Sequence, residues 1–355
     1  MSEEIGVREG LDAKSMTIEE LTAFFAGRGE KPYRAKQAFA WMHKERVKSW
    51  GEMTNLSKAL REELEKDPLT VLRVEQVQTS ALDGTKKYLF ALPDGALVES
   101  VLMPYHHGNS VCISSQVGCR MGCSFCASTL GGKERDLLPS EMLEQIYRIG
   151  VETGQRVDSV VVMGTGEPMD NYENFVRFVR LLTDPAGQGL SQRSITVSTC
   201  GLVPQIYRLA EEGLAITLAI SLHAPDDELR KKLMPIAHRY SIDEILSACR
   251  TYFQKTGRRV TYEYSLIDGV NDSEEQAYAL AERLRGMGGH VNLIPVNPVR
   301  ERAYRRSALE SVARFKNTLE NCQINVTIRR EMGADIDGAC GQLRARALSQ
   351  RPKNG

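Results

Sequence analysis

The sequence has no excess of charge of either sign. Its 46 lysines and arginines balance 46 aspartates and glutamates, so the formal net charge is zero at pH 7. A chain that bound polyanions through its overall charge would be strongly basic. Any surface of this protein that binds nucleic acid must therefore be a local one.

Long apolar runs are also absent from the sequence. No stretch approaches the roughly 18 apolar residues of a membrane-spanning helix. The first residues, Met1 to Glu4, are acidic where a secretion signal would be basic. The composition, with 42% hydrophobic and 26% charged residues, excludes collagen-like and wholly disordered chains. We expect a cytoplasmic protein with no membrane partner, and its 355 residues favour one large domain with a smaller one.

The spacing of apolar residues changes along the chain. Residues 1–70 have helical spacing, with a capping box formed by Thr17 and Glu20, and we interpret them as a small helical accessory domain. Residues 71–104 alternate as strands do and predict a short antiparallel extension. Strands and helices then alternate through residues 105–345, and residues 346–355 form a basic tail.

The alternating part of the chain predicts an α/β fold, an incomplete (βα)6 barrel. Functional residues of such barrels lie at the carboxyl ends of the parallel strands. Ser140 and Ser241 are expected to cap two of its helices. The expected strands are residues 111–115, 157–163, 194–199, 215–222, 260–266 and 291–294, with 324–328 as an additional late strand.

Three of the eight cysteines lie close together in a CxxxCxxC pattern. A disulfide framework is not expected in a chain of this length without a secretion signal. Thiolates on so short a loop can bind a soft metal centre. Structural zinc needs four protein ligands, so the triplet favours a 4Fe-4S cluster with one open iron, although a distant His106 or His107 could complete a zinc site. The candidate ligands are Cys119, Cys123 and Cys126.

Glycines and small polar residues follow several of the expected strands. Strand 157–163 runs into a glycine turn, where the backbone can approach a ligand and Glu167 can meet an ammonium group. Later strand ends carry Ser198, Ser221 and Asn297. Each of these alone is typical of a cap or a turn, whereas together they predict a cofactor-binding wall.

These motifs resemble those of the radical S-adenosylmethionine superfamily, in which such a triplet ligates a 4Fe-4S cluster. The resemblance is closest to one family, the dual-specificity radical S-adenosylmethionine RNA methyltransferases that methylate carbon 2 of adenine. It covers nearly the whole chain from about Glu19. The segments that carry it are VCISSQVGC at 111–119, MGTGEP at 163–168, LIPVNP at 293–298 and DIDGACGQL at 335–343.

The resemblance implies a mechanism that uses two molecules of S-adenosylmethionine per turnover. One methylates Cys340, and the second is split at the reduced cluster to give the radical that removes hydrogen from the methylated cysteine. The methylene radical adds to the base, Glu99 accepts the proton, and Cys112 attacks the sulfur of Cys340 to release the RNA. The implied cofactor contacts are Gly166, Glu167, Ser198, Ser221, Leu222, His223 and Asn297.

The resemblance also implies the partners. The family's substrates are an adenosine at the peptidyl-transferase centre of 23S rRNA and the adenosine 3′-adjacent to the anticodon in some tRNAs. An external one-electron donor is required, and we expect a monomer. A basic segment from Arg28 to Lys48 and a second patch at residues 300–306 become candidate RNA contacts. Without the resemblance, the first segment is typical of a solvated helix face.

Three alternatives stay open at this point. A related antibiotic-resistance branch shares the cysteines but methylates carbon 8 of the rRNA adenosine. A glycyl-radical activating enzyme would share only the cluster triplet, and a non-catalytic, zinc-dependent RNA-binding protein would use the cysteines as zinc ligands. Thr165 and Cys200 depart from the family's common pattern, and neither change removes a reactive group.

Overall fold

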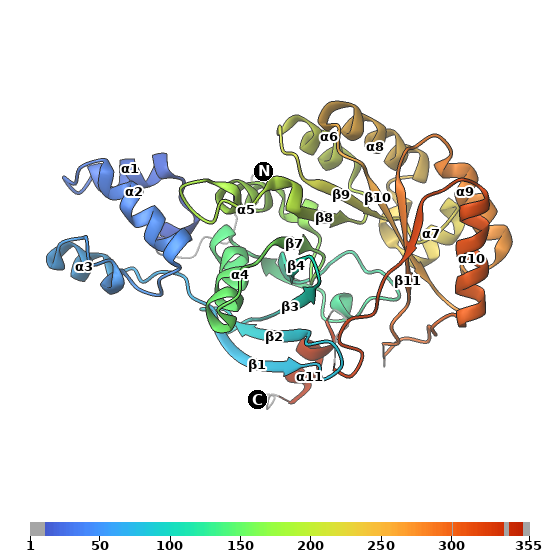
Figure 1. The fold of residues 1–355 in the computed structure, drawn as a ribbon, viewed down its shortest axis with the longest axis horizontal. Coiled ribbons are helices and arrows are strands. Elements are labelled where there is room, and N and C mark those ends of the chain that lie inside the picture. Colours follow the sequence, from blue (N-terminus) through green and yellow to red (C-terminus); the bar gives the residue numbers. More distant parts are fainter. Residues whose placement is uncertain (1–10, 300, 337–340, 351–355) are drawn as a thin grey trace.

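The computed structural model describes residues 11–299, 301–336 and 341–350, and one ten-stranded sheet forms its centre (Figure 1). The strand order is β1-β2-β3-β4-β7-β8-β9-β10-β11-β12. Strands β1 to β4 pair antiparallel, and the pairs from β4 onward are parallel. The strands are β1 (Arg73–Thr79), β2 (Lys86–Ala91), β3 (Leu97–Tyr105), β4 (Gly108–Ile113), β7 (Ser159–Val162), β8 (Ile195–Thr199), β9 (Thr217–Ser221), β10 (Thr261–Leu266), β11 (His290–Pro295) and β12 (Val326–Ile328).

The parallel strands confirm the predicted α/β fold. Each of the six expected barrel strands overlaps an observed one, from β4 to β11, and the late strand β12 pairs with β11. Apolar residues such as Val160 and Val162 of β7 are buried because helices cover the outer face of the strands. Since β1 and β12 stand at opposite ends of the strand order, the sheet stays open, as an incomplete barrel requires.

Amphipathic helices lie along the outside of the curved sheet (Figure 1). On α5, for example, Phe175, Val179 and Leu182 are buried while Arg180 faces solvent. In the part of the chain that the structure describes, no helix is both long and apolar enough to cross a membrane. The barrel helices are α4 (Pro139–Thr153), α5 (Tyr172–Thr183), α6 (Val203–Glu211), α7 (Asp227–Leu233), α8 (Ile242–Thr256), α9 (Glu274–Leu284) and α10 (Leu309–Asn321).

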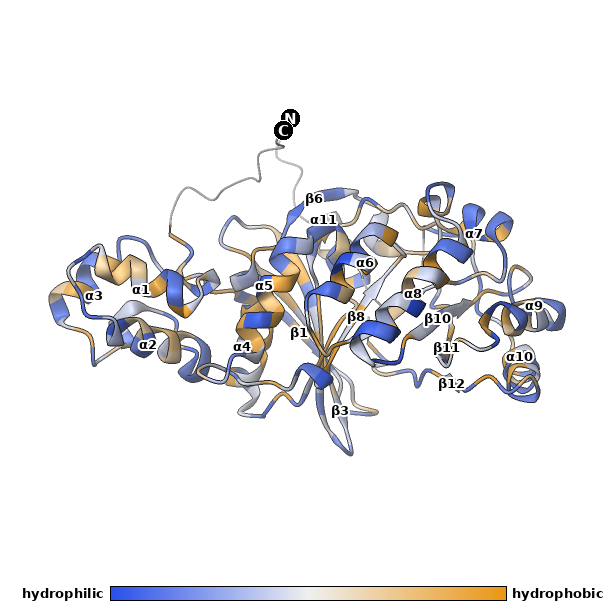
Figure 2. Ribbon diagram, turned by 90° about the horizontal axis from the view of Figure 1, so that it is seen from above, coloured by the Kyte–Doolittle hydropathy of each residue, from blue (hydrophilic) through white to orange (hydrophobic). Residues whose placement is uncertain are grey.

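Short helices form a lobe beside the barrel, and Figure 2 shows α4 and α5 between this lobe and the strands. The predicted capping box is present, since Glu20 N–H donates to Thr17 Oγ1 (3.3 Å) and Thr17 N–H donates to Glu20 Oε2 (2.9 Å). Buried Phe25, Phe39 and Trp50 belong to the lobe's core. The lobe contains η1 (Ala13–Ser15), α1 (Ile18–Ala26), α2 (Tyr33–Ala40), η2 (Trp41–Glu45), η3 (Trp50–Glu52) and α3 (Lys58–Leu64).

A buried ion pair fastens the lobe to the barrel. Lys14 Nζ lies 2.7 Å from Glu144 Oε1 of α4, and both side chains are inaccessible to solvent. Burial lowers the pKa of Lys14, and the carboxylate of Glu144 opposes that shift. A second contact joins His43 Nδ1 to the hydroxyl of Tyr147, also on α4, at 3.0 Å. The lobe is therefore held in a fixed orientation relative to α4.

The prediction that Ser140 caps a helix is wrong. Helix α4 begins one residue earlier, at Pro139, and Leu138 occupies the N-cap position. The Ser140 hydroxyl instead donates to Asp12 Oδ2 at 2.9 Å, so it joins the barrel to the segment before the lobe. Ser241 does cap α8, as expected, by accepting from Glu244 N–H.

The end of the described chain is a helix, α11 (Gln342–Gln350), which runs through position 346 where the sequence predicts the start of a tail. The helix packs against the sheet because Leu343 is buried against Leu89 and Leu97. Arg344 is buried as well, and its Nε donates to the carbonyl oxygen of Leu97 (2.8 Å). These contacts hold the start of α11 on strands β2 and β3.

Candidate active site

The cysteine triplet lies on the loop between β5 (Gln116–Gly118) and β6 (Lys133–Asp136), which form a separate hairpin. Gly118 has a φ of +77°, and a Cβ there would overlap the carbonyl oxygen of Gly132. The N–H of Cys119 donates to this same oxygen at 2.9 Å. Only glycine permits this close approach, which joins the two ends of the loop.

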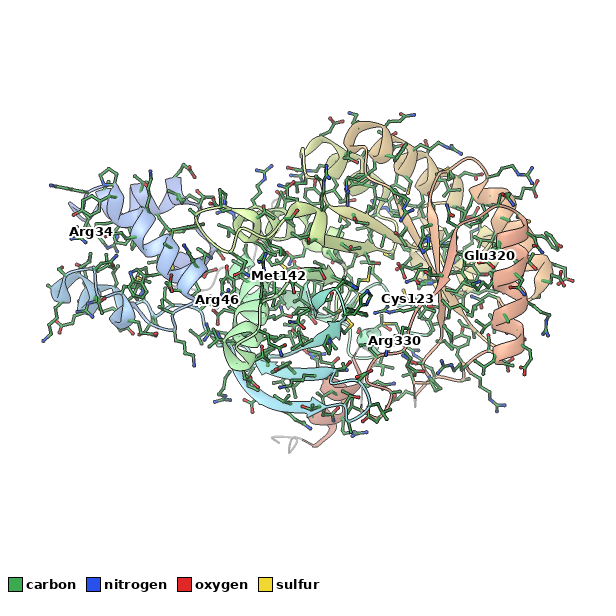
Figure 3. All side chains as sticks on the ribbon, viewed as in Figure 1. Arg34, Arg46, Cys123, Met142, Glu320 and Arg330 are labelled. Carbon is green, nitrogen blue, oxygen red and sulfur yellow. The ribbon has the colours of Figure 1, made fainter. Side chains whose placement is uncertain are left out.

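A cavity of about 280 Å³ lies at the carboxyl ends of the parallel strands. Figure 3 shows one of its residues, Cys123, near the middle of the molecule. The cysteine loop, the turn after β7 and the ends of β8, β9 and β11 contribute its walls, which is the edge where barrels of this kind bind ligands. Nine of the predicted site residues line it: Cys119, Cys123, Cys126, Gly166, Glu167, Ser198, Ser221, His223 and Asn297.

Leu222 is a predicted cofactor contact that does not line this cavity. Its side chain is fully buried, and its N–H donates to the carbonyl oxygen of Glu263 (3.0 Å). Its own carbonyl oxygen accepts from Arg230 Nε (3.2 Å). The structure therefore places Leu222 behind the cavity wall, where its backbone joins β9 to β10.

The turn after β7 brings the backbone and a carboxylate to the cavity. Gly166 has a φ of +112°, and a Cβ there would lie 2.6 Å from the Cβ of Gln116. Glu167 is buried, with Oε2 accepting from Cys200 N–H (2.7 Å) and Oε1 from Met169 N–H (3.0 Å). Burial raises the pKa of this carboxyl, and the two backbone amides oppose the shift. The result is a rigid acceptor that can receive a ligand's ammonium group.

His223 follows β9 in the left-handed conformation, with a φ of +57°. Its Nδ1 accepts from Ser265 N–H at 2.9 Å. Burial, with a smaller contribution from Arg230, lowers its pKa to about 3. The ring is therefore neutral and carries its proton on Nε2. It packs edge-to-face on Phe125 of the cysteine loop, with ring centroids 5.0 Å apart.

The cysteines fit an iron-sulfur cluster better than a single zinc ion. Burial raises the pKa of Cys119 to about 12 and also raises that of Cys123, so binding of a cation must displace their protons. Among the described residues, no three His, Cys, Asp or Glu side chains are placed to share one metal ion. Three cysteines that ligate separate irons of a cube need not converge so closely. His106 and His107 pack edge-to-face, with ring centroids 4.9 Å apart, and do not line the cavity.

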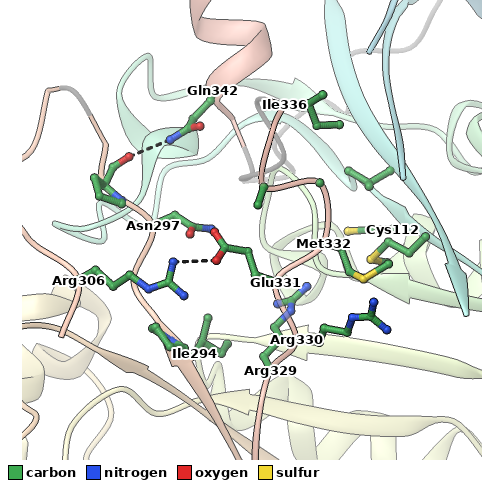
Figure 4. Close-up of a pocket in the computed structure, with 16 residues that line it drawn as sticks. Cys112, Ile294, Asn297, Arg306, Arg329, Arg330, Glu331, Met332, Ile336 and Gln342 are labelled. Atoms are coloured by element: carbon green, nitrogen blue, oxygen red, sulfur yellow. Dashed lines mark hydrogen bonds and ion pairs between the residues drawn. The ribbon is translucent and has the colours of Figure 1, made fainter. Parts of the chain in front are cut away.

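A second cavity, of about 260 Å³, adjoins the first and is drawn in Figure 4. Ile294, Asn297 and Arg329 line both cavities, so one wall separates the two spaces. Cys112 of β4, the predicted resolving cysteine, lines the second cavity. The thiol therefore lies beside the predicted cofactor space and not within it.

Glu99, the predicted proton acceptor, lines neither cavity. Its buried carboxylate is paired with Lys87 Nζ at 2.9 Å. It also accepts hydrogen bonds from the backbone N–H groups of Gly341 (2.7 Å) and Arg344 (2.5 Å). Cys340, the predicted methyl carrier, lies outside the described residues.

Three charged residues of the site are not predicted from the sequence. Arg230 of α7 is fully buried, and its Nη2 donates to the carbonyl oxygen of Cys200 (2.6 Å) at the end of β8. Glu263 and Arg329 line the cofactor cavity, and burial raises the pKa of Glu263. Arg230 belongs to a charged segment, DELRKKL, in which nothing distinguishes a buried arginine from a solvated one.

The two residues that depart from the family's pattern lie at different depths. Cys200 lines the cofactor cavity, and burial raises the pKa of its thiol well above the ordinary value. Thr165 is buried behind the wall, where its N–H donates to Ser114 Oγ at 3.0 Å. Of the two, only Cys200 faces the space where a cofactor would bind.

The first basic segment lies on the lobe, far from the cavities, and Figure 3 shows Arg34 near its outer end. Arg34 is half-buried beside Glu30, and Arg46 is half-buried near α4. The other basic side chains are exposed to solvent. These are Arg28, Lys31, Lys36, Lys44 and Lys48.

The second basic segment lies at the border of the active site. The hydroxyl of Tyr304 lies 2.9 Å from Ser124 Oγ on the cysteine loop. Arg306 lines the second cavity and is paired with Glu331 at 2.7 Å. Arg300 lies outside the described residues. This segment therefore borders both the cluster loop and the cavity that contains Cys112.

Comparison with known proteins places this site in a family. Residues 113–281 match the sequence model of the Radical SAM superfamily, where SAM is S-adenosylmethionine. Residues 12–68 match the model described as "Ribosomal RNA large subunit methyltransferase N-terminal domain". Both matches agree with the resemblance drawn from the sequence.

Whole-length relatives agree with these domain matches. A "Probable dual-specificity RNA methyltransferase RlmN" of Lachnospira eligens is 62% identical over 334 residues, which are 94% of this chain and 95% of the relative. The protein of the same name from Lachnoclostridium phytofermentans is 58% identical over 340 residues, 95% of each chain. The crystal structure of a radical SAM methyltransferase from Sphaerobacter thermophilus, 45% identical, superposes with a TM-score of 0.90 and covers 94% of this chain and 98% of that one. The chain therefore belongs to the radical SAM, dual-specificity RNA methyltransferase family.

Proposed function

We propose that this enzyme methylates carbon 2 of adenosine in 23S rRNA and in tRNA, through a methyl group carried on Cys340. Its relatives are named as dual-specificity RNA methyltransferases. The observation that carries the proposal is the pair of adjoining cavities, one with the three cysteines and one with Cys112. Carbon 2 of adenine is not nucleophilic, so a chemistry other than simple displacement is required.

The first cavity would hold both cofactors. Cys119, Cys123 and Cys126 would ligate the 4Fe-4S cluster, and Glu167 would receive the ammonium group of S-adenosylmethionine. Ser198, Ser221, His223 and Asn297 supply further polar groups around the same space. When bound, the cluster and two molecules of S-adenosylmethionine per turnover would supply the methyl group and the hydrogen-abstracting radical.

The second cavity combines the apolar and cationic groups that a nucleotide requires. Its lining includes the apolar residues Val101, Met103 and Ile336, against which a flipped base can pack. It also includes Arg329 and Arg330, which can contact a phosphate. We assign this cavity to the target adenosine, which would then lie beside Cys112.

The thiols would complete the reaction. The thiolate of Cys112 would attack the sulfur of Cys340, a sulfur–sulfur bond would form, and the bond between that sulfur and the transferred carbon would break. Glu99 is our candidate for the acceptor of the proton from carbon 2. The resulting disulfide has to be reduced again, and an external one-electron donor has to reduce the cluster.

The lobe would bind a part of the RNA that lies at a distance from the target base. Its exposed Arg28, Lys31, Lys36, Lys44 and Lys48 can contact phosphates without reading sequence. We propose that residues 1–70 form this RNA-binding domain, that 71–104 form the antiparallel extension, and that 105–345 form the barrel. We also propose that the protein acts in the cytoplasm as a monomer.

The experiment that tests this function is mass spectrometry of digested RNA. The anaerobically purified enzyme is incubated with a reductant, S-adenosylmethionine, and transcripts of 23S rRNA fragments or tRNA. We expect 2-methyladenosine in both RNAs. Only 8-methyladenosine would support the antibiotic-resistance alternative, and no methylated RNA together with zinc in place of iron would support the RNA-binding alternative.

A further inference from the structure

The start of α11 is fastened to strand β3 by one buried carboxylate. Glu99 Oε2 accepts from Gly341 N–H (2.7 Å), and Oε1 accepts from Arg344 N–H (2.5 Å). The first amides of a helix have no partner within the helix, and a carboxylate there satisfies them and interacts favourably with the helix dipole. Gly341 is therefore fixed to the sheet through Glu99.

Lys87 makes this arrangement possible. Its ammonium lies 2.9 Å from Glu99 Oε2, and the two side chains are 0% and 5% exposed. A buried carboxylate without a cationic partner is strongly destabilising, whereas a paired and hydrogen-bonded one is tolerated. Lys87 lines neither of the two cavities, so its effect on their contents passes through the residues that it holds.

The strand register places this ion pair next to the resolving cysteine. Lys87 of β2 is paired with Val101 of β3, and Val101 is paired with Cys112 of β4. Directly paired residues have their side chains on one face of a sheet, and Glu99, two positions before Val101, shares that face. Leu343 of α11 packs on the same region. The ion pair, the resolving thiol and the start of α11 are thus neighbours.

Described residues on both sides of positions 337–340 are held by hydrogen bonds to carboxylates. Upstream, the carboxylate of Asp335 accepts from Ser80 Oγ (2.5 Å) and Ala81 N–H (2.8 Å) in the turn after β1. Downstream, Gly341 is held by Glu99. Neighbouring Cα atoms are about 3.8 Å apart, so fixing Gly341 limits the positions that the adjacent Cys340 can reach.

We propose that Lys87 is a positioning residue for methyl transfer, which acts through Glu99 and Gly341 on the segment that carries Cys340. The proposal rests on the function proposed above for Cys340. Lys87 keeps Glu99 in place as the cap of α11, and that cap holds Gly341, the residue after the carrier cysteine, on strand β3. Neutralising Lys87 releases the start of α11, with Gln342 at the edge of the second cavity, while the first cavity keeps its lining residues.

The test compares Lys87→Met with Lys87→Arg and with Lys86→Met in the anaerobic, full-length enzyme. Lys86 is the adjacent lysine on β2 and points to the opposite face. Hydrogen–deuterium exchange is followed in the peptide 341–350. We expect exchange in Lys87→Met to be at least about tenfold faster, the factor for one lost charge-assisted hydrogen bond. Lys87→Arg and Lys86→Met should match the wild type, and unchanged exchange in Lys87→Met would overturn the proposal.

A second variant keeps the test decisive if Lys87→Met does not fold. Replacing both partners, in Lys87→Met/Glu99→Leu, removes the buried charges together and is tolerated far better than removing one. Exchange in 341–350 should again be fast while the barrel strands stay protected. Retained protection of this peptide would overturn the role of the ion pair.

Steady-state kinetics distinguish a positioning role of Lys87 from a role in RNA binding. In Lys87→Met we expect kcat for RNA methylation to fall by about tenfold, in step with the lost contact, and KM for RNA to change less than kcat, because Arg329 and Arg330 are not part of α11. An unchanged kcat would contradict the proposal. Peptide mapping of the wild type distinguishes the two hypotheses, because absence of a methyl group on Cys340 would overturn the proposed function whatever the exchange data show.

Discussion

Glu167 accepts a hydrogen bond from the backbone N–H of Cys200 across 2.7 Å, and this contact joins the turn after β7 to the end of β8. The carboxylate has a second backbone donor, Met169 N–H at 3.0 Å. Two fixed donors leave the remaining lone pairs directed at the cavity. The wall of the cofactor site is therefore rigid before any ligand binds.

Glu167→Gln is expected to weaken the binding of S-adenosylmethionine. Glutamine has only one acceptor oxygen, so one backbone amide loses its partner and the negative charge that faces an ammonium group disappears. The loss of about 1–3 kcal/mol per unmade buried bond predicts at least about a tenfold rise in Kd. Equilibrium dialysis with the reconstituted enzyme measures it. Glu173→Gln, at an exposed position, serves as the control. Equal affinities for S-adenosylmethionine in the wild type and in both variants would contradict the role of Glu167.

Gly118→Ala is expected to prevent cluster assembly without unfolding the barrel. The added Cβ would overlap the carbonyl oxygen of Gly132, and the residue has a φ of +77° that alanine rarely adopts. The two ends of the cysteine loop would separate, while β5 and β6 lie outside the main sheet. Iron analysis should find little iron and circular dichroism a native fold. Gly131→Ala, where an added Cβ meets nothing within 4 Å, is the matched control, and normal iron content in Gly118→Ala would disprove the argument.

His43 is expected to make the stability depend on pH. The ring is fully buried, and burial lowers its pKa from 6.5 to about 3. Because the folded state binds the proton less well than the unfolded state, the stability contributed by the neutral ring is complete above about pH 6.5 and falls as the pH drops toward 3.

Urea unfolding between pH 7.5 and 5 measures this effect. As the pH drops below 6.5, the free energy of unfolding should decrease more steeply in the wild type than in His43→Gln. The difference in slope should reach up to about 1.4 kcal/mol per pH unit. The exposed His238→Gln should behave like the wild type. Parallel curves for wild type and His43→Gln would show that the buried histidine makes no such contribution.

Arg330 is expected to bind substrate phosphate. It lines the cavity that contains Cys112, beside Arg329 (Figure 4). Arg330→Ala should raise KM for RNA by about tenfold and reduce the dependence of binding on salt by about one counterion. Arg314→Ala, on the exposed face of α10, is the control. A fall in kcat with an unchanged KM would instead assign Arg330 to a later step.

The sequence predicts strand ends well because apolar runs and glycine turns are local signals. The strand that ends before Gly166 and the capping box at Thr17 are examples, and both are observed. Leu222 shows the limit of this reasoning. Its place in a motif predicts a contact but does not say whether the side chain or the backbone makes it.

Long-range contacts are the part that one sequence does not predict. Arg230 is buried because carbonyl oxygens from two different strand ends meet its guanidinium, and no spacing along α7 reveals this. Arg344 lies in a basic segment, yet Leu97 and Glu134 receive its side chain. The hydrogen-bond partners of both arginines are more than five residues away along the chain. The charge of the surrounding segment therefore predicts a solvated side chain, which is wrong for both.

Cys340 is the proposed carrier of the methyl group, and Cys112 is the thiol proposed to release it. The most direct measurement is the intact mass of wild type and Cys112→Ala, purified anaerobically from cells, followed by nuclease digestion and peptide mapping. Without the resolving thiol, the covalent intermediate cannot break down. We predict a nucleotide adduct on Cys340 in Cys112→Ala and none in the wild type. An unmodified Cys340 in the variant would contradict the account.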